Sequence, residues 1–547
     1  MSDQPRPNFV IFMPDQLRAD AIDAFGNPHI STSHIDALAA RFTNAFVQHP
    51  VCSPSRASIL TGWYPHTASH RTLTHLLKEN EPNLLRIGLP RDLGRPPAET
   101  PSPPASPSRA STSTASRPGP PSATRATTDG VWSRLFYRSR VPDDGRIDPG
   151  EAAIRSAEQW LAAPPEQPWV LFVPMVAPHC PFQVEEPWFS RFDRDTVPDP
   201  AAPADDPARE PRYMRAIRDR YGIEDVTPEQ WREVVATYYG MIARLDDQLG
   251  RVMKAVADAG AADDTVTLFL ADHGEYLGDH GLIEKWPSAM HDCITRDPLI
   301  ISGGGFEGGQ VCDSMVEMID VLPTVLELAR VEAPHRHFGR SLTPLLMDRT
   351  GPHRQYAFTG GGFTEEEPQL EQPAFPYDLK SALQHEVPTL VGKAVAVRDQ
   401  EWTYVWRLYE APELYDRAKD PQERTNLAGG ASTPPSSSGC ATRCCAGSWR
   451  PPTSSRPRRT RAFPRWSCPR PEPARDSRPS PPAPPHLQGA FHECAVHWLE
   501  EPRLVTPASR KAPVRRWKLK PRHPFRACPG DVGVWRQMPV LVVIQAR

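Results

Sequence analysis

Short apolar runs alternate with amphipathic stretches along residues 1–429. Apolar runs at 8–14, 169–175 and 265–271 are typical of strands buried on both faces of a parallel sheet. The segments 148–161 and 227–259 each begin with a helix-capping signal and continue with helical periodicity. The two patterns together predict an α/β fold.

Further elements follow from the same patterns. We predict a helix and a strand within 32–46, an amphipathic helix over 73–87, a strand over 296–301 and a helix over 320–330. From Ala394 onward apolar and polar residues alternate, as in Trp402-Thr403-Tyr404-Val405-Trp406. Alternation of this kind indicates a small antiparallel sheet, which we assign to a C-terminal subdomain over 391–429.

Two segments, 88–129 and 430–547, break these patterns. They hold 31 of the 66 prolines, and Leu93 is the one large apolar side chain between residues 90 and 129. We predict a disordered insert and a disordered tail, both produced by out-of-frame translation of GC-rich DNA; a genuine disordered insertion is the alternative. The main domain then covers 1–87 and 130–390.

The net charge of −3 is the sum of two unequal parts. Residues 430–547 carry 21 Lys+Arg against 6 Asp+Glu, which leaves 42 against 60 for the rest of the chain. A basic tail could bind nucleic acid. We favour the out-of-frame reading, which makes this charge incidental, and expect no nucleic-acid partner.

The distribution of cysteines and apolar runs bears on location. The body of the chain has four widely spaced cysteines, without the spacing of a disulfide framework or a zinc site. This usage is typical of a reduced intracellular protein. The apolar run Phe9–Met13 is too short for a signal peptide, and no run approaches the roughly 18 apolar residues of a membrane span. We predict a cytoplasmic protein without a membrane partner.

Cys52 opens the segment with the most distinctive chemistry. The sequence from His49 to Gly62 predicts a turn that leads into a short helix, with Ser53 or Ser55 as its N-cap. A helix N-terminus and the guanidinium of Arg56 would favour a negative reacting group and a dianionic substrate. A buried structural cysteine is the alternative.

Polar residues follow three of the predicted strands, where open α/β sheets bind ligands. Asp15 and Gln16 follow the first strand, and Asp15 is either a metal ligand or a helix N-cap. Asp272 and His273 follow the third strand and offer oxygen and nitrogen donors to a cation. His179, after the second strand, is interpreted as functional, whereas we expect His280 to be structural.

Several strings resemble those of type I, formylglycine-dependent sulfatases of the alkaline phosphatase superfamily. Cys-Ser-Pro-Ser-Arg followed by Ala-Ser-Ile-Leu-Thr-Gly resembles the family signature, and Pro-His-Cys-Pro at 178–181 and Asp-His-Gly at 272–274 resemble two further motifs. The resemblance covers 1–87 and 130–429. It implies a large mixed, mostly parallel sheet sandwiched by helices, with a small C-terminal antiparallel subdomain.

The resemblance also implies a mechanism for cleaving a sulfate monoester. A formylglycine-generating enzyme would oxidise Cys52, and the hydrated aldehyde would attack sulfur. Arg56 would orient that aldehyde, while His179 and Lys285 would bind the sulfate and help the leaving group. The cation would be calcium, with manganese or magnesium as alternatives. The implied metal ligands are Asp15, Gln16, Cys52, Asp272 and His273.

The chain departs from the family pattern in three places, one of which is the absence of the family's C-terminal helix. Gln16 stands where most members have a second aspartate, as in a subset that resembles choline sulfatases and phosphonate monoester hydrolases. The strand with a Gly-Lys pair is missing, since no lysine lies between Lys78 and Lys254. We predict a sulfuric ester hydrolase; the alternatives are a phosphonate monoester or phosphodiester hydrolase and an inactive product of a frameshifted gene.

Overall fold

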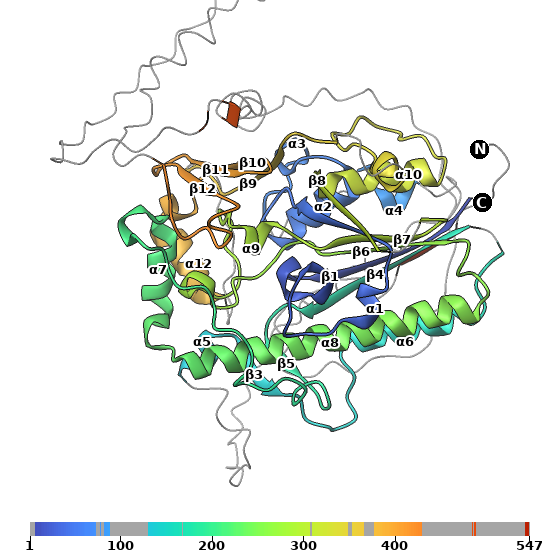
Figure 1. The fold of residues 1–547 in the computed structure, drawn as a ribbon, viewed down its shortest axis with the longest axis horizontal. Helices are drawn as coiled ribbons and strands as arrows, with labels where there is room; N and C mark the ends of the chain where they lie inside the picture. The colour runs from blue at the N-terminus through green and yellow to red at the C-terminus, as the bar shows by residue number, and fades with distance from the viewer. Residues whose placement is uncertain are drawn as a thin grey trace, which may run out of the picture.

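The main body of the molecule is one large sheet with helices on both faces (Figure 1). The computed structural model describes residues 6–72, 77, 81–87, 130–166, 168–306, 309–347, 353–365, 377–428, 484, 486–487 and 542–545. The strands of the large sheet are, in spatial order, β13 (Val542–Gln545), β4 (Trp169–Pro178), β1 (Asn8–Asp15), β6 (Thr265–Leu270), β7 (Leu299–Gly303), β2 (Ala40–Phe46) and β8 (Gln310–Glu317).

Most strands of this sheet run in one direction. β1 pairs in parallel with β4 and β6, and β2 pairs in parallel with β8. β7 is antiparallel to both β6 and β2. The group of β4, β1 and β6 therefore runs in the same direction as the pair of β2 and β8. The predicted mixed, mostly parallel sheet is therefore confirmed for the part of the chain that the structure describes.

Each face of the sheet has its own core because side chains alternate along a strand. Val10 and Phe12 of β1 join the cluster beneath the long helices, whereas Phe9, Ile11 and Met13 join the cluster on the opposite face. The first face is covered by α6 (Pro149–Leu161) and α8 (Pro228–Asp258), and the second by α2 (Cys52–Thr61) and α10 (Val321–Leu328). β1 is thus buried between two helical layers.

The capping signals in the sequence define the starts of the two long helices. Asp148 accepts a hydrogen bond from the backbone of Glu151 at the start of α6. Thr227 and Gln230 form a reciprocal capping box at the start of α8. Such caps satisfy amide groups that the first turn of a helix leaves unpaired. Both predicted helices are confirmed.

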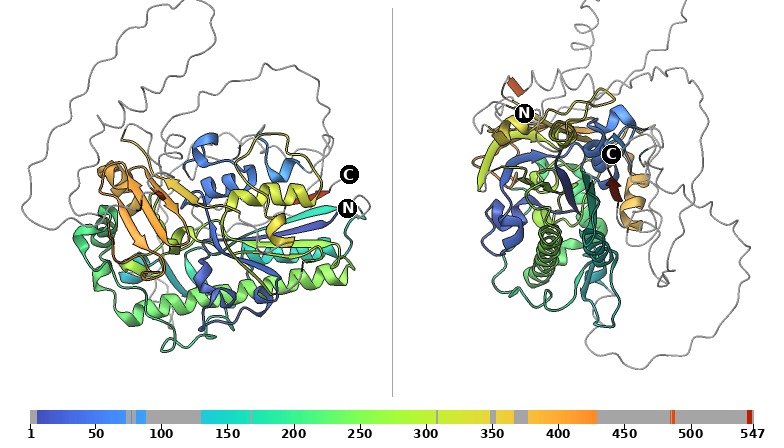
Figure 2. Two further views of the ribbon diagram at one scale, coloured as in Figure 1. Left: turned by 45° about the horizontal axis from the view of Figure 1, so that its top comes forward. Right: turned by 90° about the vertical axis from the view of Figure 1, so that its right-hand side faces the viewer.

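A second, antiparallel sheet stands beside one end of the large sheet (Figure 2). Its strands are, in spatial order, β12 (Glu413–Asp416), β11 (Trp402–Arg407), β10 (Ala394–Arg398) and β9 (Ala357–Gly361). The alternation from Ala394 onward predicted this sheet correctly. β9 lies before the predicted start of the subdomain at residue 391. Its pairing with β10 joins residues that are distant in sequence, which the local alternation does not reveal.

The remaining described elements are short. They are α1 (Ser33–Asp36), α3 (Pro65–Ala68), α4 (Leu84–Ile87), α5 (Val131–Arg134), β3 (Tyr137–Arg140), β5 (Phe182–Val184), α7 (Arg212–Tyr221), α9 (Asp292–Thr295), α11 (Thr343–Met347) and α12 (Asp378–Glu386). None of the helices among the described residues is long and apolar enough to cross a membrane. The cytoplasmic location stays a prediction.

The predicted helix over 73–87 is wrong at 81–83, which is not helical. Pro82 disfavours a helical conformation at the residue before it. Glu81 instead accepts a hydrogen bond from His70, with 2.7 Å between Oε2 and Nε2, which ties this stretch to the preceding loop. Within the described part of this segment the helix is confined to α4.

The predicted disordered tail contains one described strand. β13 pairs antiparallel with β4 and adds a strand to the large sheet. The run Val542-Val543-Ile544 is β-branched and therefore favours a strand. The predicted insert 88–129 lies outside the described residues, as does the tail apart from 484, 486–487 and β13.

Candidate active site

The large sheet brings two predicted metal ligands together at the ends of neighbouring strands. β1 ends at Asp15, and Asp272 follows β6, the strand that pairs in parallel with β1. The carboxyl ends of parallel neighbours lie at the same edge of a sheet. The backbone amide of Gln16 donates a 3.0 Å hydrogen bond to Asp272 Oδ1, which fixes the two strand ends side by side.

Four buried side chains form a group that could hold a metal ion. Asp15, Cys52, Asp272 and His273 each offer one ligand atom, and these atoms lie within 4.8 Å of one another. Burial is the largest influence on the pKa of Asp15 and raises it, and the neighbouring carboxylate of Asp272 raises it further. Two buried carboxylates this close favour a nearby cation. The donor set therefore fits a divalent metal.

His273 is oriented toward the centre of this group by the backbone of the next residue. Its Nδ1 lies 2.8 Å from the carbonyl oxygen of Gly274 and donates to it, which leaves Nε2 as the lone-pair nitrogen. Nε2 lies 3.0 Å from Cys52 Sγ. Gly274 has no room for a side chain, since a Cβ there would lie 2.0 Å from the carbonyl oxygen of Cys293.

Cys52 is the first residue of α2. The prediction of Ser53 or Ser55 as N-cap is wrong: Val51 occupies that position without a side-chain hydrogen bond, and helical hydrogen bonding begins between its carbonyl and the amide of Ser55. Burial raises the pKa of the Cys52 thiol well above its usual value, and Asp15 raises it further. The unmodified residue is a neutral thiol.

Arg56 lies one turn further along α2 and bridges both carboxylates. Its Nε is 2.5 Å from Asp272 Oδ2, and a terminal nitrogen is 2.9 Å from Asp15 Oδ2. The guanidinium is the cation on which these two strand ends converge. It holds the carboxylates in place; its predicted role in orienting the hydrated aldehyde stays a prediction.

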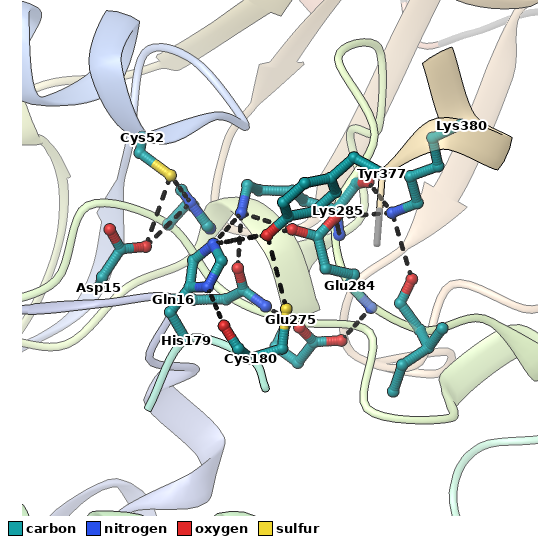
Figure 3. A network of polar contacts seen from close by, with 12 residues as sticks. Asp15, Gln16, Cys52, His179, Cys180, Glu275, Glu284, Lys285, Tyr377 and Lys380 are labelled. Carbon is teal, nitrogen blue, oxygen red and sulfur yellow. Dashed lines mark hydrogen bonds and ion pairs between the residues drawn. The ribbon is translucent and has the colours of Figure 1, made fainter. Parts of the chain in front are cut away.

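His179 and Lys285 meet beside this group (Figure 3). Lys285 Nζ lies 2.8 Å from His179 Nε2, 2.6 Å from Gln16 Oε1 and 2.7 Å from Glu284 Oε1. His179 Nδ1 donates to the carbonyl of Cys180 at 2.6 Å. Burial and the Lys285 ammonium lower the pKa of His179 to about 3, so its ring is neutral and Nε2 accepts from Lys285.

Gln16 connects the two parts of the site. Its backbone has a φ of 65°, in the left-handed region, which turns the chain sharply after β1. The side-chain amide donates to Glu275 and accepts from Lys285. The amide oxygen is thus hydrogen bonded to an ammonium group, and a metal-ligand role for Gln16 stays a prediction.

Sequence reasoning missed four residues in this polar network. Glu275 and Glu284 lie in the sequence close to the predicted metal ligand His273 and to Lys285. Their position could therefore have indicated that they belong to the site. Tyr377 and Lys380 come from a segment about a hundred residues away, with no motif to mark them. Burial and, to a smaller extent, the neighbouring Glu284 raise the pKa of Glu275 to about 7.

A separate cavity of about 290 Å³ lies elsewhere in the molecule. Arg18, His280 and Glu423 line it, whereas Cys52 and Lys285 do not. His280 is therefore not among the four residues of the candidate metal group, and its structural role stays a prediction.

The fold is a sheet between two helical layers, and the candidate metal group lies where its strands end. Residues 7–88 and 148–331 match the sequence model of the family described as Sulfatase. The chain is similar to enzymes of the sulfatase family of the alkaline phosphatase superfamily.

Similar proteins cover most of the chain. A multifunctional alkaline phosphatase superfamily protein of Trinickia caryophylli is 27% identical, with 78% of this chain and 91% of that protein aligned. An arylsulfatase of Clostridium perfringens is 24% identical over 77% of this chain and 90% of its own. The phosphonate monoester hydrolase of Agrobacterium radiobacter has a similar fold, with a TM-score of 0.59, 23% identity, and 80% and 94% of the two chains covered.

Proposed function

We propose that the protein hydrolyses sulfate monoesters at Cys52 after this residue has been converted to formylglycine. The observation that carries the proposal is the position of Cys52 at the start of α2, with Sγ 3.0 Å from His273 Nε2 and 3.5 Å from Asp15 Oδ1. The match to the Sulfatase family model and the similarity to an arylsulfatase support the same reaction.

The state of the thiol supports the need for conversion. A cysteine nucleophile is normally activated by a lowered pKa, whereas burial raises the pKa of Cys52. Conversion by a formylglycine-generating enzyme would replace the sulfur with an aldehyde oxygen. The hydrated aldehyde would supply an oxygen nucleophile in the same position.

A divalent cation would be held by Asp15, Asp272 and His273, with Gln16 as a further candidate ligand. It would supply positive charge to the sulfate oxygens and to the nucleophile. Carboxylate oxygens suit calcium, and the imidazole nitrogen also suits manganese. We propose calcium, with manganese and magnesium as alternatives.

The remaining residues prepare the site for an anionic substrate. A sulfate ester reacts slowly because its oxygens repel nucleophiles and because an alkoxide leaves poorly. Arg56 keeps Asp15 and Asp272 in fixed positions. Lys285 and His179 would bind the sulfate oxygens, and the Lys285–His179 hydrogen bond offers a path for a proton to the departing oxygen.

The test is co-expression with a formylglycine-generating enzyme. The mass of the peptide that contains Cys52 should fall by the difference between a thiol and an aldehyde side chain. The modified protein should then hydrolyse an aryl sulfate, lose this activity with a chelator and regain it with calcium or manganese. An unmodified thiol under these conditions would contradict the proposal.

A second candidate is hydrolysis of phosphonate monoesters or phosphodiesters. Gln16 favours it, because a neutral amide stands where most sulfatases have a second aspartate. The ratio of kcat/KM for an aryl sulfate to that for an aryl phosphonate monoester separates the two. A folded, modified and metal-loaded chain that turns over neither substrate would instead be a non-catalytic product.

A further inference from the structure

Helix α12 contributes a buried lysine to the lysine part of the site. Lys380 has 3% of its surface exposed. Its Nζ lies 2.6 Å from Glu284 Oε2 and 2.6 Å from the carbonyl oxygen of Lys285 (Figure 3). No family motif in the sequence includes this residue.

Glu284 lies between two ammonium groups. Its Oε1 accepts from Lys285 Nζ at 2.7 Å and its Oε2 accepts from Lys380 Nζ at 2.6 Å. The backbone amide of Lys285 also donates to Oε2 at 3.0 Å. Burial raises the pKa of Glu284, but Lys285 and Lys380 oppose this and lower it below the usual value. Glu284 is therefore a carboxylate.

The charges of these three groups decide what the site offers an anion. Glu284 and Lys285 alone would neutralise each other. With Lys380 paired to the other carboxylate oxygen, the three buried groups carry a net charge of +1. Charges interact strongly in a buried environment, so this difference matters for an anionic substrate.

The surroundings of Lys380 hold it in place. Leu383, one turn further along α12, is buried in the main core cluster. The ring of Phe136 lies against the lysine, with 5.8 Å between Nζ and the ring centroid. Tyr377, at the start of the helix, places its hydroxyl 3.5 Å from His179 Nε2. α12 thus faces both proposed sulfate-binding residues.

We propose that Lys380 is a positioning residue for anion binding: by holding Glu284, it keeps the Lys285 ammonium available to the anionic group of the substrate. The proposal rests on the proposed function and adds to it a residue that acts through Glu284. It also assigns α12 to the active site, opposite the strand ends that carry the metal ligands.

The test compares three variants at Lys380 and Glu284. Lys380→Met should weaken the binding of inorganic sulfate and lower kcat/KM for an aryl sulfate, each by about tenfold. Lys380→Arg, which keeps the charge, should recover most of both losses. The double variant Lys380→Met with Glu284→Gln should also recover them, because it removes the carboxylate that would otherwise neutralise Lys285.

A purely structural ion pair gives a different pattern. Lys380→Met would then lower the melting temperature, while sulfate affinity and kcat/KM per folded molecule stay at the wild-type values, and this result would overturn the proposal. So would a double variant that is no better than Lys380→Met. Lys254→Met, at an exposed lysine of α8, is the control and should change neither quantity.

The two proposals fail in distinguishable ways. Sulfate binding is measured by calorimetry on the folded chain and needs no turnover. A wild-type protein that binds sulfate but cleaves no sulfate ester would contradict the proposed function. The ratio of the sulfate affinities of the wild-type protein and Lys380→Met would still decide the role of Lys380. Absence of sulfate binding in the wild-type protein would overturn the role of Lys380.

Discussion

The two ends of the candidate site are built in opposite ways. The metal end joins Asp15 and Asp272, which follow adjacent parallel strands, to Arg56 and has more negative than positive charge. The lysine end joins Lys285 to Lys380, from a distant helix, and has more positive than negative charge. A site with these two poles can hold a cation at one end and an anion at the other, as cleavage of an anionic ester requires.

The largest expected effect is at Cys52, which belongs to the metal end of the site. Cys52→Ala removes the only side chain that could become the proposed nucleophile, so turnover of an aryl sulfate should fall by at least about a thousandfold. Sulfate binding should persist, because the lysine end is unchanged. Initial rates and calorimetry check the two parts. Turnover that survives the substitution would remove Cys52 from the mechanism.

Asp272→Asn should break the metal end alone. The substitution removes one carboxylate from the candidate metal group and from its pair with Arg56. We expect bound metal and turnover to fall by about a hundredfold, as loss of a charged ligand or its support typically causes. Elemental analysis after dialysis measures the metal. Asp263→Asn, at an exposed position before the same strand, should leave the metal content unchanged.

The metal end could be predicted from the sequence because its geometry is local. Asp15 is the last residue of one apolar strand and Asp272 comes shortly after its parallel neighbour, and neighbouring parallel strands bring such residues together. Cys52 and Arg56 are one helical turn apart, so one helix start positions both.

The lysine end could be predicted only in part. His179 and Lys285 belong to recognisable strings, but Lys380 approaches through tertiary packing of α12. No periodicity of α12 reveals which buried carboxylate its lysine will meet. The strand β13 was missed for a related reason: a short β-branched run becomes a strand when an edge such as that of β4 is available to pair with it.

Gln16→Glu tests whether the two poles must remain separate. The isosteric carboxylate would accept from Lys285 as the amide does, but it would also face Glu275, to which Gln16 now donates. A second negative charge at the lysine end should lower sulfate affinity and kcat/KM by about tenfold. Calorimetry with inorganic sulfate checks this. An unchanged affinity would show that charge at the lysine end does not control anion binding.

The smallest effect should come from a buried acid that belongs to neither end. Glu423 accepts a 2.7 Å hydrogen bond from the amide of Asp292 through Oε2. Burial and, to a smaller extent, the neighbouring Asp292 raise its pKa from 4.5 to about 8. The folded protein therefore binds a proton that the unfolded chain releases near pH 4.5. The stability that this proton contributes is complete below that pH and is lost as the pH rises toward 8.

Glu423→Gln keeps the acceptor for Asp292 and removes the ionisable group. Relative to the wild-type protein, its free energy of unfolding should increase by about 1 kcal/mol or more between pH 6 and pH 9, while kcat stays the same. Denaturant unfolding at both pH values measures this, with the exposed Glu401→Gln as the matched control. A change in kcat together with stability would mean that buried charge anywhere in the molecule influences the reaction. A change in stability without a change in kcat would mean that only buried charges at the two ends of the site influence the reaction.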